Sequence, residues 1–348
     1  MKPEEARSAA KQKLKGICGV YKACDGDPSR LCQNQIYGGP MQIGGAGSGA
    51  SFANNYSDLA KMRVRMQVIG EHFEPDTTTT LFGKPMQMPI YAAPVTGVNS
   101  FGGESVITEE AFCEATVEGS KQAGTIAFRG DTSTYSSAYT PGIDAIKAAG
   151  GHGIKIIKPR LQQDILRFIA CAEDAGALAV GVDVDGCGSY MMNANKQPVF
   201  RKSIRELREL ASSTKLPFIV KGVMCVQDAE AAVEAGAACV VVSNHGGRVL
   251  DCTPGTATVL QDIAKAVGKY CTVLADGGVR TGTDVAKMLA LGAEGVLIGR
   301  DIIRAAIGGG AAGVRGHMEH LQKTLASTML MTGCPTLTDI TPAILEPH

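Results

Sequence analysis

The chain has 348 residues, enough for one large domain or two ordinary ones with a sizeable apolar core. Hydrophobic residues make up 45% of the chain and charged residues 20%, as in a globular protein, and the formal net charge is zero. A neutral chain gives no electrostatic reason to expect a nucleic acid or another polyanion as a partner.

The N-terminal stretch MKPEEARSAAKQKLKG predicts a charged helix and lacks the apolar core of a signal peptide. No apolar run approaches the ~20 residues that a membrane-spanning helix needs, so no membrane partner is expected. Eleven cysteines, an odd number, lie mostly in apolar runs, which fits reduced thiols in the cytoplasm better than a disulfide framework. Cys18, Cys24 and Cys32 match no standard ligand spacing, so no metal site is predicted.

Residues 1–85 are predicted to form a helical and glycine-rich cap segment, with a glycine-rich stretch at 37–52 and a helix near 54–66. In residues 86–348, short apolar runs alternate regularly with helical patterns. Eight runs predict strands: PIYAAP, TIAFRG, GIKIIKP, ALAVGVDV, PFIVKG, ACVVVSN, TVLADGG and EGVLIGR. Each is almost continuously apolar, which is typical of parallel strands covered on both faces.

Eight strand-helix units over about 220 residues predict an α/β fold of the (β/α)8 TIM-barrel type. An open, doubly wound sheet is the alternative, but APVTGVNSFGG after the first strand does not supply the expected GxGxxG. The active site of a TIM barrel lies at the carboxyl ends of its strands. We therefore expect the residues at the strand ends to meet at one mouth: Pro94, Val95, Thr96, Gly130, Lys158, Arg160, Asp183, Lys221, Ser243, His245, Asp276, Gly277, Gly278, Gly299 and Arg300.

The last two strands are followed by glycine and arginine, in ADGGVRTGTD and GVLIGR. Backbone N–H groups freed by glycine and a nearby helix N-terminus predict a phosphate site, to which Arg280 and Arg300 would add charged contacts. Ordinary turns with surface arginines are the alternative. Lys221 could form a Schiff base, hold an anion or make a structural ion pair, and its position alone does not choose between these roles.

The stretch VVSNHGGRVLD places His245 and Arg248 at the end of the sixth strand. Histidine is the side chain best suited to taking a proton near neutral pH, and the arginine fork fits a carboxylate. Because Lys221 and Asp183 are predicted on the same rim, we predict a catalytic role for this group.

These motifs resemble the FMN-dependent 2-hydroxy-acid oxidases and dehydrogenases. The resemblance lies in VKGV, DAEAAVEAGA, VVSNHGGRVLD, ADGGVRTGTDVAKMLALGAEGVLIGR and TTTLFGKPMQMPIYAAP, and it runs from about Gly44 to the end of the chain. It implies a homotetramer of TIM barrels that bind FMN and a small anionic substrate. The implied FMN contacts are Gly278, Arg280, Gly299 and Arg300 at the phosphate, Asp276 and Gly277 at the ribityl chain, Pro94, Val95, Thr96, Gly130 and Lys158 along the flavin, and Lys221 with Ser243 at its N1–O2 edge.

The resemblance also implies the substrate-side roles. His245 would take a proton from the substrate, Asp183 would orient His245, and Arg248 would bind the substrate carboxylate. The predicted reaction oxidises a 2-hydroxy acid to the 2-oxo acid with the flavin as electron acceptor. The alternatives are an FMN-dependent reductase or isomerase with another substrate, and a non-catalytic barrel that binds a phosphate ligand.

Three substrate-side positions depart from the family pattern. Met41 stands where a tyrosine is typical, Lys158-Pro159-Arg160 replaces a Gln-x-Tyr, and Tyr190 replaces a second carboxylate-binding arginine. We hypothesise that Arg160 supplies the missing cation or that the substrate is a different, larger anion. A second positive charge at Lys158 should raise the reduction potential of the flavin. His317 and His320 are predicted to lie on a solvated face of the final helix.

Overall fold

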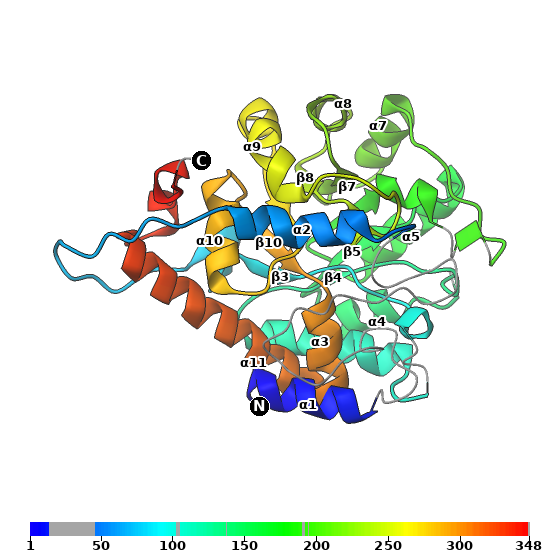
Figure 1. The fold of residues 1–348 in the computed structure, drawn as a ribbon. Helices are drawn as coiled ribbons and strands as arrows, with labels where there is room; N and C mark the ends of the chain where they lie inside the picture. Colours follow the sequence, from blue (N-terminus) through cyan, green and yellow to red (C-terminus); the bar gives the residue numbers. More distant parts are fainter. Residues whose placement is uncertain (14–45, 102–104, 137, 190–191, 194, 347–348) are drawn as a thin grey trace.

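The computed structural model describes residues 1–13, 46–101, 105–136, 138–189, 192–193 and 195–346 (Figure 1). Eight parallel strands stand in the order β3-β10-β9-β8-β7-β6-β5-β4, and a parallel bridge between Ala92 and Ala127 joins the first to the last. The ring is closed, so the predicted TIM barrel is confirmed. All eight predicted strands are present: β3 (Ile90–Ala92), β4 (Phe128–Arg129), β5 (Ile154–Ile157), β6 (Ala179–Asp183), β7 (Phe218–Val223), β8 (Cys239–Val242), β9 (Thr272–Ala275) and β10 (Gly295–Ile298).

Helices surround the ring: α3 (Glu109–Gln122), α4 (Pro141–Ala148), α5 (Gln162–Asp174), α7 (Ile204–Ser212), α8 (Val226–Glu234), α9 (Thr256–Val267), α10 (Gly282–Ala290) and α11 (Arg300–Thr332). The strand side chains divide between two apolar clusters. Those that point inward fill the barrel with residues such as Tyr91, Phe128 and Leu297, while Val240 and Val242 pack outward against the helices. Burial on both faces is why each strand reads as a continuous apolar run. Of the helices in the described ranges, none combines the length and apolar character that crossing a membrane requires.

An antiparallel hairpin, β1 (Thr79–Leu81) and β2 (Lys84–Met86), precedes the barrel. Leu81 and Met86 are buried and join the cluster inside the ring. The hairpin therefore closes the end of the barrel at which β3 begins, and the opposite end, at the strand carboxyl termini, is left as the mouth.

The described parts of the N-terminal segment lie in two places. Helix α1 (Pro3–Lys13) packs along α11, whereas α2 (Ala50–Lys61) lies beside α9 and the short turn η3 (His245–Gly247) at the barrel mouth (Figure 1). The boundary between residues 85 and 86 stays a prediction. The glycine-rich stretch before residue 46 and the three early cysteines lie outside the described residues.

The prediction for the final helix is half right. His320 is exposed, but His317 is buried, and burial lowers its pKa against the opposing charge of Asp301. His317 lies near enough to Asp301, Arg280 and Arg304 for their charges to act on it, and such packing leaves no local pattern in the sequence.

Glycines in α11 let α1 approach closely. A methyl group on Gly308 would overlap the backbone carbonyl of Ala6, whereas one on Gly309 would overlap the flexible side chain of Met1 and make an ordinary 3.6 Å contact with Ala6 Cβ. We expect Gly308→Ala to lower the free energy of unfolding by about 1–3 kcal/mol, the usual cost of overpacking. Urea unfolding of Gly308→Ala beside Gly309→Ala measures this, and equal losses in the two variants would contradict it.

Candidate active site

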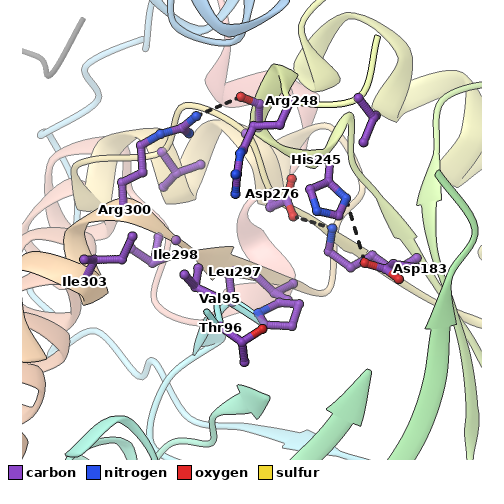
Figure 2. Close-up of a pocket in the computed structure, with 18 of the residues that line it drawn as sticks. Val95, Thr96, Asp183, His245, Arg248, Asp276, Leu297, Ile298, Arg300 and Ile303 are labelled. Carbon is purple, nitrogen blue, oxygen red and sulfur yellow. Dashed lines mark hydrogen bonds and ion pairs between the residues drawn. The ribbon is translucent and has the colours of Figure 1, made fainter. Parts of the chain in front are cut away.

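A pocket opens at the carboxyl ends of the strands. Figure 2 shows His245 and Asp183 on one side of it, Arg248 and Arg300 on another, and Val95 and Thr96 below them in the view. Most of the predicted site residues line it: Pro94, Val95, Thr96, Lys158, Asp183, Lys221, His245, Arg248, Asp276, Gly277, Gly278, Arg280, Gly299 and Arg300. The expectation that residues at the carboxyl ends of the strands meet at one mouth therefore holds for most of them.

The turn after β8 directs His245 into the pocket. His245, Gly246 and Gly247 all have positive φ, and His245 at 57° is in the left-handed region that non-glycine residues rarely adopt. Asn244 supports the turn, because its Oδ1 accepts a hydrogen bond from the Gly247 amide at 3.1 Å. A disfavoured backbone conformation held in place by its surroundings is typical of functional positions.

The same turn is tied to α2. The side-chain amides of Asn244 and Asn55 donate to each other, at 3.1 and 2.9 Å. Asp251 accepts hydrogen bonds from the Ser48 and Ala50 amides at 2.6 and 3.1 Å, which lower its pKa to about 2. The segment that carries His245 therefore also fixes the start of α2.

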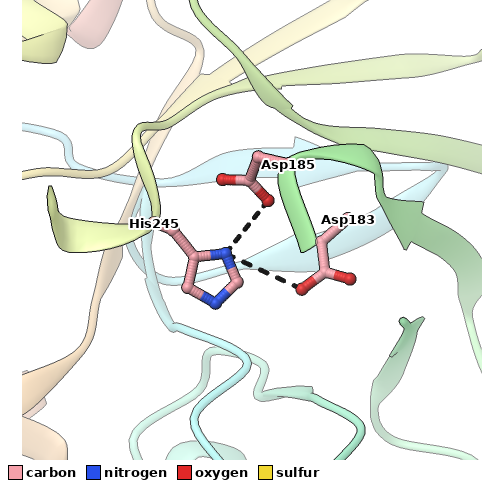
Figure 3. Close-up of side chains that lie close together, drawn as sticks. All are labelled: Asp183, Asp185 and His245. Carbon is pink, nitrogen blue, oxygen red and sulfur yellow. Dashed lines mark hydrogen bonds and ion pairs between the residues drawn. The ribbon is translucent and has the colours of Figure 1, made fainter. Parts of the chain in front are cut away.

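His245 lies beside two carboxylates, Asp183 and Asp185 (Figure 3), and beside the ammonium group of Lys158. Its Nδ1 is 3.0 Å from Asp185 Oδ1 and 3.9 Å from Asp183 Oδ2, while Lys158 Nζ is 3.2 Å from Nε2. An ammonium group only donates, so Nε2 is the acceptor and the ring proton lies on Nδ1 toward Asp185. Burial and the Lys158 charge lower the pKa of His245, against the opposing effect of Asp185. This keeps the imidazole neutral and able to take a proton.

The hydrogen-bond partner of His245 is a correction to the sequence analysis. Asp183 was expected to orient the ring, but its Oδ2 accepts a 2.7 Å hydrogen bond from Lys158 and lies beyond hydrogen-bond distance of Nδ1. Asp185 makes the contact instead. The three ligand-type atoms lie within 4.8 Å of one another, a spacing that could also hold a metal ion. However, Lys158 already supplies the positive charge at this place.

Lys221 is a buried cation at the base of the pocket. Its Nζ donates to Ser243 Oγ at 2.8 Å and lies 3.3 Å from Asp276 Oδ2. Burial disfavours the charged amine, but Asp276, Asp185 and Asp183 outweigh that effect and raise the pKa of Lys221. A protonated amine is not a nucleophile, so the structure favours the anion-holding and ion-pair roles over a Schiff base.

The expected phosphate site lies at the start of α11. Gly299 precedes this helix and gives it no side-chain cap, although the Ile302 amide donates to the Gly299 carbonyl at 2.9 Å. Gly299 and Arg300 line the pocket, so the positive end of the helix dipole lies beside it. Arg300 lies 4.5 Å from the centre of the Phe52 ring, and Arg280 lies 5.0 Å from that of Tyr56. Phe52 and Tyr56 are four residues apart on one face of α2, and sequence reasoning missed both.

Arg160 is the second correction. Its Nε and Nη2 bond Asp131 at 2.7 and 2.8 Å, its Nη1 bonds Gln197 at 2.8 Å, and its Nη2 also bonds the Thr132 carbonyl at 2.7 Å. The guanidinium is directed into the protein and does not line the pocket. The hypothesis that Arg160 binds the substrate carboxylate is therefore wrong in this structure. Asp131, which it holds, does line the pocket and was missed.

The remaining predicted residues lie below the pocket or outside the described part of the chain. Ser243 lies behind Lys221, and Gly130 packs against the Pro94 carbonyl, where a side chain would overlap it. Neither lines the pocket surface. Tyr190 and Met41 lie outside the described residues.

A TIM barrel with a helix N-terminus and two arginines beside its last strands, and an imidazole across the mouth, is typical of enzymes that hold a cofactor or substrate by a phosphate group. A family model described as FMN-dependent dehydrogenase matches residues 41–199 and 189–347. Glycolate oxidase 3 of Arabidopsis thaliana is 31% identical over 329 residues, covering 82% of this chain and 85% of that protein. L-lactate dehydrogenase of Caulobacter sp. (strain K31) is 34% identical over 352 residues, covering 87% and 92%.

Among solved structures, one of mandelate oxidase superposes with a TM-score of 0.79 at 26% identity, covering 99% of this chain and 97% of that one. Another, a mandelate oxidase variant with a monooxide FMN adduct, gives 0.73 at 29% identity over 87% and 92%. The chain belongs to the family of FMN-dependent 2-hydroxy-acid oxidases and dehydrogenases. Its cofactor is FMN.

The pocket residues fit FMN. Asp276 Oδ1 and Arg248 Nε are buried without a hydrogen-bond partner in the described residues, which leaves an acceptor and a donor for bound groups. Gly278 lies so close to the Asn55 backbone that a side chain there would overlap it. Gly278, Arg280, Gly299 and Arg300 would hold the phosphate, Asp276 a ribityl hydroxyl, and Lys221 the edge of the flavin that gains negative charge.

Proposed function

We propose that this enzyme oxidises a small 2-hydroxy acid to the 2-oxo acid, with His245 as the base that takes the substrate proton. The observation that carries the proposal is the presence of an imidazole, whose Nε2 accepts a hydrogen bond, and a half-buried arginine in one pocket. Burial, and then the Arg300 charge, lower the pKa of Arg248 to about 10, so it remains protonated at neutral pH. A half-buried cation whose buried Nε has no partner in the described chain is suited to a carboxylate.

The chain's own residues prepare the reaction. Arg248 binds the substrate carboxylate and places the hydroxyl-bearing carbon before His245 Nε2. Lys158 lies beside Nε2 and is the second positive charge for the substrate carboxylate, the role that the sequence analysis gives to Arg160. Its ion pair with Asp183 stays in place. When bound, FMN accepts the two electrons that leave the substrate carbon. Met192 and Val249 line the pocket and offer apolar contact to the substrate side chain.

Anaerobic mixing of the yellow holoenzyme with candidate acids tests this function. The relatives are named for glycolate, lactate and mandelate, so these acids form the first panel. Loss of the flavin absorbance with at least one of them, and release of the 2-oxo acid, supports the proposal. Loss of absorbance only with NADPH or NADH would select a reductase instead, and an inert flavin would overturn oxidation.

Lys158 should raise the reduction potential of bound FMN. It lines the pocket, and its positive charge favours a reduced flavin that carries negative charge. We expect Lys158→Gln to lower the midpoint potential by tens of millivolts, roughly the effect of one partly screened charge. Redox titration of this variant measures the shift. Lys61→Gln, on the exposed end of α2, is the control, and an unchanged potential in both variants would refute the role.

We also propose that the chain forms a cytoplasmic homo-oligomer, a tetramer by resemblance to the family. Residues 65–75 extend away from the barrel body (Figure 1), with Ile69 97% exposed and Met66 and Val68 also exposed. Exposed apolar side chains on such an arm support contact with a second copy. Light scattering of the holoenzyme measures the subunit number.

A further inference from the structure

Two carboxylates lie beside the same imidazole, but they bind different groups. Asp183 ends β6, and its Oδ2 is 2.7 Å from Lys158 Nζ. Asp185 lies in the turn η2 (Val184–Gly188), and its Oδ1 is 3.0 Å from His245 Nδ1. Figure 3 shows both carboxylates directed at one ring nitrogen. The distances separate them, because 3.9 Å between Nδ1 and Asp183 is too long for a hydrogen bond.

The neighbouring strand makes room for Asp185. Pairing between β7 and β8 shifts register between Lys221 and Val223, and Gly222 in this irregularity has φ of 96°. A side chain on Gly222 would begin 2.7 Å from Asp185 Cβ and would be closer still to its carboxyl group. Asp185 therefore occupies a space that exists only because residue 222 is glycine. Burial opposes ionisation of Asp185, but His245 and the two lysines lower its pKa, so the group stays charged.

We propose that Asp185, seated against Gly222, is the positioning residue of His245, and that Asp183 instead holds Lys158. The inference rests on the proposed function of His245 and adds that the two carboxylates have different roles. Asp185 fixes the tautomer with the proton on Nδ1, which leaves the Nε2 lone pair for the substrate. It also stabilises the imidazolium that forms when Nε2 takes the proton.

The arrangement also explains how Lys158 can leave Nε2 free. Its hydrogen bond to Asp183 is 2.7 Å and that to His245 is 3.2 Å, so a substrate hydroxyl that displaces Lys158 from Nε2 leaves the shorter contact intact. Lys158 then remains beside the bound acid as a cation.

Stopped-flow reduction of the holoenzyme under anaerobic conditions separates the two carboxylates. We expect Asp185→Asn and Gly222→Ala to lower the limiting rate on the order of 10²-fold with little change in the half-saturating substrate concentration. Asp183→Asn should mainly raise the half-saturating substrate concentration, because Lys158 loses the carboxylate that holds it beside the substrate. Gly236→Ala is the matched control, because Gly236 has a φ of 93° but its nearest neighbour is Ala211 Cβ at 3.7 Å. It should react as the wild type does.

The pH profile gives a readout that a purely structural role would not move. Lys158, Asp183, Asp185 and Lys221 are the charged groups that face His245. Burial and the Lys158 charge lower the pKa of His245, and Asp185 raises it. Loss of the Asp185 charge should therefore lower the pKa of His245 further. The base is active when neutral, so the acidic limb of kcat/KM should move to lower pH in Asp185→Asn.

Nitrogen NMR of histidine-labelled holoenzyme tests the inference without substrate. The chain has six histidines, and His245→Asn identifies the resonance of interest. We expect Nδ1 to be protonated in the wild type and the two tautomers to mix in Asp185→Asn. The inference would be overturned if Asp185→Asn kept the wild-type tautomer of His245, the wild-type limiting rate and the wild-type acidic limb of kcat/KM. If no hydroxy acid reduces the wild type, the proposed function fails, while the tautomer measurement still decides the role of Asp185.

Discussion

Replacing His245 by alanine is expected to slow flavin reduction by a 2-hydroxy acid by about 10⁴-fold, the upper end of what a general base contributes. His245 is the neutral imidazole whose Nε2 faces the pocket, and no other described histidine lines that pocket. FMN should stay bound, because the residues that would hold its phosphate follow the last two strands and begin α11. Stopped-flow absorbance measures the rate, and the flavin spectrum reports occupancy.

A second substitution removes the concern that a backbone change causes the loss. His245 has φ of 57°, and asparagine tolerates this left-handed conformation better than alanine does. His245→Asn should therefore reduce the flavin as slowly as His245→Ala does, and its free energy of unfolding should be at least as high as that of His245→Ala. If either variant kept more than about a tenth of the wild-type rate, far above what loss of a base permits, another group would have to take the proton.

Replacing Lys221 by methionine is expected to lower the free energy of unfolding by about 3–5 kcal/mol, the cost of leaving a buried charge without its partner. Lys221 Nζ is the ammonium nearest Asp276, whose other oxygen has no partner in the described residues. The reduced flavin also loses a stabilising charge, so the midpoint potential should fall. Urea unfolding and redox titration of the holoenzyme measure the two effects.

A double variant separates the ion pair from general packing. Lys221→Met with Asp276→Asn removes both charges, so it should be more stable than Lys221→Met alone. If the two variants were equally unstable, the loss would come from the side-chain volume of Lys221, and the buried ion pair would contribute little.

The sequence was sufficient for the barrel and for most of its mouth. Continuous apolar runs located β3 to β10, because strands covered on both faces need apolar residues at every position. The fold rule then placed Lys221, His245, Asp276 and Arg300 together. These inferences need only the ends of strands, which local patterns mark well.

The errors lie just beyond the strand ends. Asp185 and Arg160 both follow a strand by two or three residues, after Asp183 and Ile157. There the backbone leaves the strand geometry, so alternation no longer says which side a residue faces. The turn η2 brings Asp185 back to His245, whereas the loop after β5 sends Arg160 to Asp131. Phe52 and Tyr56 could not be predicted, because they meet Arg300 and Arg280 only through long-range packing.

The hydrogen-bonded side chains of Asn55 and Asn244 connect helix α2 to the turn after β8. Asn244 precedes the imidazole proposed as the base, and Asn55 lies in α2 between Phe52 and Tyr56, the rings that contact Arg300 and Arg280. A phosphate group held by these arginines would therefore also stabilise the loop that carries His245, the proposed base. Inorganic phosphate alone, with no flavin ring present, should already order that loop.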